Sequence, residues 1–568
     1  MRLINALTLD IEDFVDPKLI PPYAILSHTW GDSEATFHDW VDVFGKRRSK
    51  NGFPKIRETC RQAVRDGHTH AWIDTVCIDK TSSGELSEAI NSMFSWYKNA
   101  AVCYIYMADV PTSPSSPFRR SRWFTRGWTL QELIAPKHAI FYSRDWQMLG
   151  TKSTLTTPIS EVTGISPGCL RGTSSPTDFS IAQIMSWASG RVTTRPEDQA
   201  YCLLGLFGVN MPMLYGEGRK AFLRLQEEII KTSDDHSIFV CDMDESNMTI
   251  SEAAAPLAAT PACFARSGLV LKLDITRSPS AAIPPFHSIT NAGLLINLPL
   301  IQTLSTHFVL GVLNCGIQEG PWRGRVCIPL TSCISNYHHR YIRVATPRSW
   351  FCIGEESLQG LNLQSRQTEN HTKPPNLDLT PNAYTKVMIS MPPKHLRRSL
   401  SDRFFTTVRN GVDVFFLVVF PLGLSDYRLH AVDPPHALER ETSLLAVMKS
   451  DESSTRGKAL LVFQDMRGEK SKSVAVYLEA ALEHHGALED WPRTCQVLPN
   501  WMPTSGLKEA SMLTSHTRQR ASWVGDVLVA LKTTIPPLAQ TAPEASVILL
   551  AEVAFKLPRL LKSVERDS

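Results

Sequence analysis

The chain has 568 residues, of which 43% are hydrophobic, and 59 basic against 56 acidic side chains give a formal net charge of +3. It is too long for a single core, so we expect at least two domains, each with enough apolar residues to fold. The balanced charge lacks the excess of basic residues typical of nucleic-acid binding, so we expect no nucleic-acid partner.

The sequence shows no targeting segment and no membrane span. Residues 1–16 lack a long apolar core and turn acidic early, unlike a secretory signal or transit peptide. The longest apolar run, 412–424, is too short for a bilayer and contains Asp413 and Pro421, so it predicts a buried strand. Twelve scattered cysteines form no CxxC pair and no Cys/His cluster with metal-ligand spacing. We therefore expect a cytoplasmic protein with reduced thiols and no metal site.

Strand and helix patterns alternate over residues 1–150. Apolar runs that predict strands lie at 23–26, 71–74, 102–110 and 138–143, and helical patterns lie at 54–67, 82–100 and 129–136. Pro54 and Gly67 mark the two ends of the first helix, and Ser82 with Glu85 predicts a capping box for the second. This alternation predicts an α/β fold, with a parallel sheet, flanking helices and right-handed crossovers.

Polar residues gather where the predicted strands end. They are Ser27, His28, Thr29 and Trp30 after the first strand, Asp74, Thr75 and Asp79 after the second, and Asp109 after the third. In a parallel sheet the carboxyl ends of the strands form the ligand-binding edge. Each residue alone is compatible with a structural role in a loop, but together they predict one site.

The pattern of apolar residues changes twice in the remainder of the chain. Residues 151–240 have dense apolar faces at helical spacing and predict a helical extension. Within it, the sequence GEGRKA at 216–221 imitates a dinucleotide fingerprint, but no strand precedes it, so it predicts a turn and a helix start. From 241 to 568 short apolar runs separated by turn-rich links predict a β-rich C-terminal domain.

Three segments of the N-terminal region resemble the fungal heterokaryon incompatibility (HET) domain. They are YAILSHTWG (23–31), WIDTVCIDK (72–80) and SRWFTRGWTLQEL (121–133), and the resemblance continues through 191–235. It implies a fungal protein of non-self recognition and innate immunity. Such a protein triggers programmed cell death when incompatible hyphae fuse or another non-self cue is sensed.

A second resemblance concerns chemistry. The HET domain is similar to the TIR domain, which implies a TIR-like sheet over 1–150. WTLQEL (128–133) is similar to the Trp-Cys-Leu-x-Glu-Leu segment that bears the catalytic glutamate of NAD cleavage in plant TIR domains, and Glu132 falls on that glutamate. Thr129 replaces the cysteine, and the TIR arginine after the first strand is absent beside Trp30. These departures leave both an active and an inactive domain open.

An acid at position 132 suits cleavage of an N-glycosidic bond, because breaking that bond places positive charge on the ribose. The resemblance implies that Glu132 is the catalytic residue of an NAD nucleosidase, with NAD as a substrate and no permanently bound cofactor. The residues expected to bind NAD are Ser27, His28, Thr29, Trp30, Asp74, Asp79, Arg122, Arg126 and Trp128. In this hypothesis Trp30 stacks on the nicotinamide, and Arg122 or Arg126 pairs with the pyrophosphate.

Two functions are compatible with the sequence. In the first, self-association of the HET domain activates NAD cleavage. In the second, the domain is a non-enzymatic death-signalling adaptor that acts by homotypic assembly, and Glu132 is an acid stabilised near a helix N-terminus. Both imply a homo-oligomer and a protein trigger or partner that the sequence does not identify.

Overall fold

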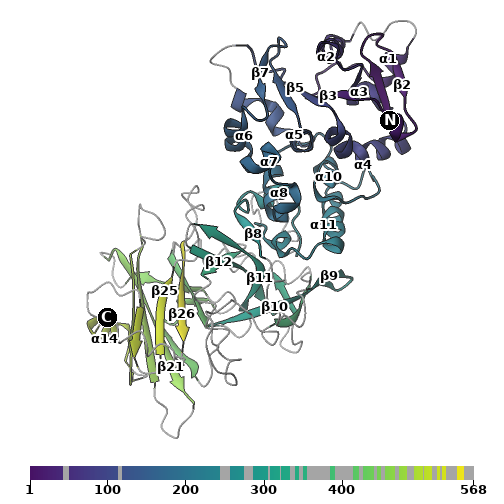
Figure 1. The fold of residues 1–568 in the computed structure, drawn as a ribbon. Helices are drawn as coiled ribbons and strands as arrows, with labels where there is room; N and C mark the ends of the chain where they lie inside the picture. Colours follow the sequence, from purple (N-terminus) through teal and green to yellow (C-terminus); the bar gives the residue numbers. More distant parts are fainter. Residues whose placement is uncertain are drawn as a thin grey trace, which may run out of the picture. The chain divides into compact units, whose positions relative to one another are not determined.

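The chain forms two compact units in the computed structural model. The N-terminal unit comprises Met1–Ser233 with Ala259–Gly268, and the C-terminal unit comprises Asp234–Ala258 with Leu269–Ser568. Figure 1 shows the elements of each. The structure describes residues 1–42, 50–112, 118–242, 256–273, 286–304, 308–319, 322–332, 340–343, 350–354, 384–390, 414–420, 427–439, 444–449, 454–466, 473–482, 492–502, 505–513, 521–524, 527–532 and 547–554.

The N-terminal unit is built on a seven-stranded sheet of order β2-β1-β4-β3-β5-β6-β7. Its strands are β1 (Arg2–Asn5), β2 (Ile11–Asp13), β3 (Tyr23–His28), β4 (His70–Trp72), β5 (Val102–Tyr106), β6 (Ala139–Tyr142) and β7 (Met148–Thr151). The four strands expected from the sequence, β3 to β6, pair in parallel, as predicted. The sequence did not predict β1, β2 and β7. These strands pair antiparallel with their neighbours and extend the sheet on both sides of the four parallel strands.

Helices surround this sheet and continue beyond it. They are α1 (Phe37–Val41), α2 (Phe53–Arg65), α3 (Asp74–Cys77), α4 (Ser83–Asn99), α5 (Thr129–Ile134), α6 (Thr156–Thr163), α7 (Pro167–Arg171), α8 (Ile181–Ala188), α9 (Asp198–Tyr201), α10 (Leu204–Phe207) and α11 (Lys220–Thr232). Short 3-10 helices are η1 (Pro17–Leu19), η3 (Phe118–Arg120), η4 (Arg122–Thr125), η5 (Pro176–Asp178) and η7 (Pro261–Phe264). The helices between β7 and residue 233 belong to the same compact unit as the sheet.

Local signals in the sequence set several helix ends. Gly67, just past α2, adopts a left-handed φ of 82°, as a glycine after a helix does. Ser82 caps α4 by accepting a hydrogen bond from the Glu85 backbone. The Glu85 carboxylate binds the backbone N–H of Asp79 at 2.7 Å instead of returning to Ser82, so only half of the predicted capping box forms. The 216–221 segment is a turn leading into α11, as predicted.

The C-terminal unit is β-rich, as predicted, with a 14-stranded and a five-stranded sheet. Its strands are β8 (Val270–Lys272), β9 (His287–Thr290), β10 (Gly293–Thr303), β11 (Phe308–Glu319), β12 (Trp322–Thr331), β13 (Arg340–Arg343), β14 (Phe351–Gly354), β15 (Tyr384–Ile389), β16 (Val414–Phe420), β17 (Tyr427–Asp433), β18 (Leu438–Glu439), β19 (Leu444–Ala446), β20 (Met448–Lys449), β21 (Arg456–Asp465), β22 (Ser473–Ala481), β23 (Arg493–Leu498), β24 (Ala521–Val524), β25 (Val527–Lys532) and β26 (Val547–Ala554). The helices described in this unit are η6 (His236–Phe239) and α14 (Leu507–Leu513).

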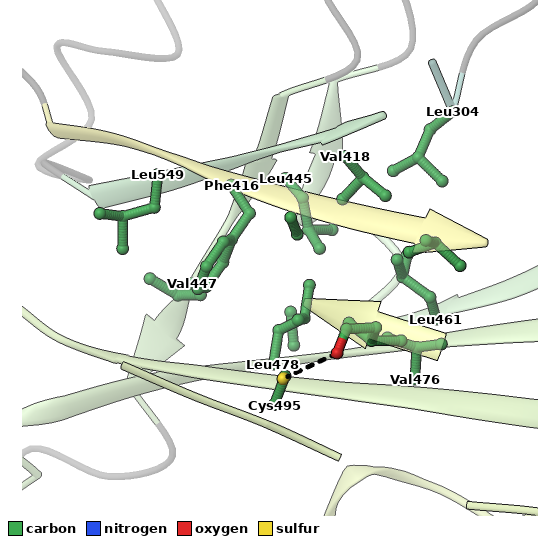
Figure 2. Packing of buried hydrophobic residues seen from close by; sticks show 14 of the residues in the cluster. Leu304, Phe416, Val418, Leu445, Val447, Leu461, Val476, Leu478, Cys495 and Leu549 are labelled. Atoms are coloured by element: carbon green, nitrogen blue, oxygen red, sulfur yellow. Dashed lines mark hydrogen bonds between the residues drawn. The ribbon is translucent and has the colours of Figure 1, made fainter. Parts of the chain in front are cut away.

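A shared apolar core joins the two sheets of the C-terminal unit. Phe416 and Val418 of β16 pack in one cluster with Leu461 of β21 and Val476 of β22, as Figure 2 shows. All seven residues of β16 are buried, which fits the long apolar run from which a buried strand was predicted. Among the described helices, none is both long enough and apolar enough to cross a bilayer.

Candidate functional site

Glu132 and Ser27 meet at the carboxyl edge of the parallel strands. Ser27 lies near the end of β3, and its hydroxyl donates a hydrogen bond of 2.5 Å to Oε2 of Glu132 on α5. The indole Nε1 of Trp123, from η4, donates to the same Ser27 oxygen at 2.9 Å. Both Ser27 and Trp123 are fully buried, and Glu132 is 7% exposed. The three side chains form a buried chain of hydrogen bonds that runs from indole to hydroxyl to carboxyl.

The direction of one bond in this chain is fixed. An indole N–H only donates, so the Ser27 oxygen accepts from Trp123. The Ser27 hydroxyl donates to Oε2 when Glu132 is ionised. Since its oxygen has a second lone pair, it can also accept from the protonated carboxyl.

The segment before α5 is held from two sides. Asp109, after β5, accepts hydrogen bonds from the Ser121 hydroxyl at 2.6 Å and from the Arg122 backbone at 2.8 Å. Gly127 donates its backbone N–H to Val192 at 2.9 Å, and a Cβ at this position would lie 2.5 Å from the Thr193 methyl. Only glycine fits this close approach, which fixes where α5 begins.

Two further side chains fix the ends of α5. The Thr129 hydroxyl donates to the carbonyls of Trp123 at 2.6 Å and Arg126 at 2.9 Å. At the other end the buried Lys152 ammonium donates to the Leu133 carbonyl at 3.2 Å and also to the Pro136 carbonyl. A cation at a helix C-terminus is stabilised by the exposed carbonyls. These contacts hold Glu132 against β3.

Burial dominates the electrostatics of Glu132. Desolvation, with a contribution from the negative charge of Asp74, raises the pKa of its carboxyl to a net value of about 8. The hydrogen bond from Ser27 and the positive charge of Arg191 act in the opposite direction. Near neutral pH the carboxyl is therefore mostly protonated, and a positive charge placed beside it favours its ionisation.

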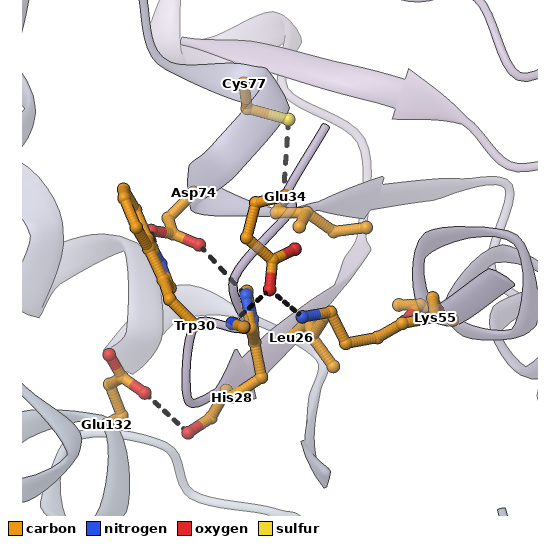
Figure 3. Close-up of polar contacts among 12 residues, drawn as sticks. Leu26, His28, Trp30, Glu34, Lys55, Asp74, Cys77 and Glu132 are labelled. Atoms are coloured by element: carbon orange, nitrogen blue, oxygen red, sulfur yellow. Dashed lines mark hydrogen bonds and ion pairs between the residues drawn. The ribbon is translucent and has the colours of Figure 1, made fainter. Parts of the chain in front are cut away.

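His28, Trp30 and Asp74 form a second group beside Glu132. Trp30 Nε1 donates to Asp74 Oδ2 at 2.9 Å, and His28 Nε2 lies 3.8 Å from Asp74 Oδ1. In Figure 3, Trp30, Asp74 and Glu132 gather on the same side of His28. Burial lowers the pKa of His28 to about 4, so its imidazole is neutral at physiological pH.

Two lysines complete this group. The Lys80 ammonium lies 3.2 Å from Asp74 Oδ2 and 3.6 Å from the centre of the Trp30 ring. Lys55 pairs with Glu34 at 2.6 Å on the other side of His28 (Figure 3). Desolvation lowers the pKa of both lysines, and their carboxylate partners oppose this effect. Burial alone would raise the pKa of Asp74, but Lys80, His28 and Trp30 together bring it below its usual value.

The other predicted binding residues are placed in different surroundings. Thr29 is buried directly after β3. Asp79 accepts hydrogen bonds from Thr81 and lies 3.3 Å from His38. Arg126 donates to Thr194 at 3.2 Å, and Trp128 is a hydrogen-bond partner of Asp198.

Arg122 is exposed, and its charge is close enough to lower the pKa of Lys55. Of the nine predicted binding residues, the structure thus brings Ser27 into contact with Glu132, and His28, Trp30 and Asp74 into one neighbouring group.

Sequence reasoning missed several residues of this site. Lys80 ends the WIDTVCIDK segment, and its charge beside Trp30 was not considered. Arg191 lies far along the chain, yet its guanidinium donates at 2.9 Å to both the Arg126 carbonyl and the Thr129 hydroxyl. Tyr97 of α4 donates to the Leu26 carbonyl at 2.9 Å and influences the carboxyl of Glu132. A lysine at the end of the motif was a readable signal, but no local pattern marks Tyr97 or Arg191.

No metal cluster is present in the part of the chain that the structure describes, where no group of three or more His, Cys, Asp or Glu side chains is arranged to hold an ion. The cysteines placed there are all buried, and none of them forms a disulfide.

Comparison with known proteins shows which family the N-terminal region is similar to. Residues 23–116 match the family model described as heterokaryon incompatibility protein (HET). The vegetative incompatibility protein HET-E-1 of Podospora anserina is 50% identical over 224 residues, which cover 37% of this chain and 16% of that relative. The match therefore spans a small part of the relative's own length. No solved structure matches the chain.

Proposed function

We propose that this chain acts in heterokaryon incompatibility, in keeping with its match to the HET family. In this proposal it triggers regulated cell death by cleaving NAD, with Glu132 as the catalytic residue. The observation that carries the catalytic part is the buried hydrogen bond between Ser27 and Glu132 at the carboxyl edge of the sheet. Burial raises the pKa of this carboxyl well above its ordinary value, and acids perturbed in this way cluster at functional sites.

The proposed reaction is hydrolysis of the bond between nicotinamide and ribose. NAD carries a positive charge on its nicotinamide ring, and this charge favours the ionised form of Glu132 when the two lie close together. As the bond breaks, the electron pair leaves with nicotinamide and positive charge develops on the ribose, where the carboxylate stabilises it. Water adds to the ribose carbon and loses a proton, which yields nicotinamide, ADP-ribose and one proton.

Residues around Glu132 have supporting roles in this proposal. Ser27 accepts a hydrogen bond from Trp123 and binds Oε2 of Glu132, and it thereby fixes the orientation of the carboxyl. Trp30 is 50% exposed and offers an aromatic surface for a nicotinamide ring. Asp74 adds a second negative charge near the same place.

The test is nicotinamide release by the purified full-length chain incubated with NAD at concentrations that favour self-association. We expect release by the wild type and a loss of at least about a hundredfold in Glu132→Gln, since that change removes the charge that stabilises the transition state. Glu88→Gln, on the exposed face of α4, is the matched control and should retain activity. Equal release by Glu132→Gln would exclude the proposed catalytic role.

A second function, a non-enzymatic adaptor, is favoured by a separate observation. β2 is the edge strand of the sheet, and large apolar side chains near it are strongly exposed, namely Leu7 (71%), Val15 (92%) and Leu19 (69%). An edge strand flanked by exposed apolar residues is a surface suited to association with another chain. In this function the HET domain recruits like domains, and no substrate is consumed.

Expression in a host fungus separates the two functions. If NAD cleavage causes death, Glu132→Gln at equal protein levels should abolish killing, whereas Glu88→Gln should kill like the wild type. If assembly alone causes death, Glu132→Gln still kills, whereas Val15→Glu abolishes both killing and the oligomer seen by light scattering.

A further inference from the structure

The Lys80 ammonium occupies a position that has the chemistry of an organic-cation site. It lies over the Trp30 ring, 3.6 Å from the ring centre, and 3.2 Å from Asp74 Oδ2. Trp30 Nε1 donates to the same carboxylate oxygen at 2.9 Å, which fixes the ring beside the negative charge. An aromatic face next to a carboxylate is the arrangement by which proteins recognise organic cations.

The same place is open to an incoming molecule. Half of the Trp30 surface is exposed, and the Lys80 side chain is 31% exposed. Lysine holds its charge at the end of a flexible stem with rotatable bonds, so its ammonium can move into solvent without a change in the backbone. Trp30 and Asp74, by contrast, lie directly after β3 and β4 and are held by the sheet.

The surrounding charges favour a cation over a neutral ligand. Asp74 is close enough to Glu132 for its charge to act on that carboxyl. A cation that replaces Lys80 interacts with Asp74, whereas a neutral ring of the same shape leaves Asp74 without its Lys80 counter-ion. The loss of an ion pair at a partly buried carboxylate disfavours the neutral ligand.

We propose that Trp30 and Asp74 form a binding site for a pyridinium-type cation, and that Lys80 occupies this site as an intramolecular competitor until the ligand displaces it. This proposal deepens the proposed function, on which it rests, because the nicotinamide ring of NAD is a pyridinium cation. It predicts that the site binds a cationic nicotinamide ring more tightly than a neutral one. It also predicts that Lys80 sets the ligand concentration at which half of the sites are filled.

The test compares N-methylnicotinamide, which is cationic, with nicotinamide, which is neutral and nearly the same shape. Binding to the full-length chain is measured by ligand-observed NMR titration. In Lys80→Met we expect the cation to bind about tenfold more tightly than in the wild type, because its competitor is gone. Lys80→Arg keeps a cation over the ring and should bind like the wild type, and in each of these chains the cation should bind more tightly than nicotinamide.

Two results would overturn the proposal. One is a Lys80→Met chain that binds the cation no better than the wild type, or that binds nicotinamide as tightly as the cation. The other is a Trp30→Leu, Lys80→Met double variant, shown by circular dichroism to be folded, that binds the cation as tightly as Lys80→Met. Since the titration involves no turnover, a chain that selects the cation but releases no nicotinamide from NAD refutes catalysis and leaves the cation site standing.

Discussion

Replacing Glu132 by glutamine should change the pH dependence of stability by a large amount. Burial raises the pKa of this carboxyl to about 8 in the folded chain, against an ordinary value of 4.5. The folded protein therefore holds the proton more tightly than the unfolded chain does. The free energy of unfolding consequently falls as pH rises from about 4.5 to about 8, and this contribution is constant above that range.

The magnitude follows from the difference between the two pKa values. It corresponds to about 5 kcal/mol over the whole range, at about 1.4 kcal/mol for each pH unit. Glutamine does not titrate. Between about pH 5 and about pH 8 the wild type should therefore lose about 4 kcal/mol of stability relative to Glu132→Gln. The effect is confined to the N-terminal unit, which contains α5.

The assay is urea unfolding at several pH values, with pulsed hydrogen exchange read by mass spectrometry in peptides that cover α5. This readout reports the N-terminal unit alone, which matters because a chain of two compact units does not unfold in one step. Glu88→Gln should show the pH dependence of the wild type. A stability difference between wild type and Glu132→Gln that stays constant within about 1 kcal/mol from about pH 5 to about pH 9 would show that the buried carboxyl is ionised throughout, contrary to our reasoning.

Three further substitutions test interactions that stabilise one unit or the other. Ser27→Ala leaves the buried Trp123 N–H without its acceptor and should lower the free energy of unfolding by about 1–3 kcal/mol, measured by the same exchange assay; an unchanged value would mean that the hydrogen bond contributes nothing. Lys152→Met keeps the apolar stem but removes the donor to the last carbonyls of α5, so we expect a loss of about 1–2 kcal/mol and faster exchange at the end of that helix, whereas unaltered exchange would contradict the capping role. Phe416→Ala opens a cavity in the core of the C-terminal unit and should cost about 3–5 kcal/mol there, with no change in peptides from the N-terminal unit.

Much of the N-terminal fold was readable from the sequence. Runs of apolar residues that alternate with helical patterns predicted β3 to β6 together with α2, α4 and α5, since burial on both faces of a parallel strand requires an apolar run. β1, β2 and β7 were missed because they are short strands of three or four residues, few of them fully buried, at the two sides of the sheet. Such strands are stabilised mainly by pairing with a neighbouring strand, so their own residues show little of the hydrophobic pattern that predicts a strand.

The sequence also predicted that Glu132 and the residues after β3 and β4 occupy the same edge of the sheet, because parallel strands end together. It did not determine their contacts. The pairing of Ser27 with Glu132, the position of Lys80 over Trp30, and the approach of Arg191 to α5 all join residues far apart in the chain. The ionisation of Glu132 likewise depends on how much water the packed helices exclude, and that is decided only when the tertiary structure has formed.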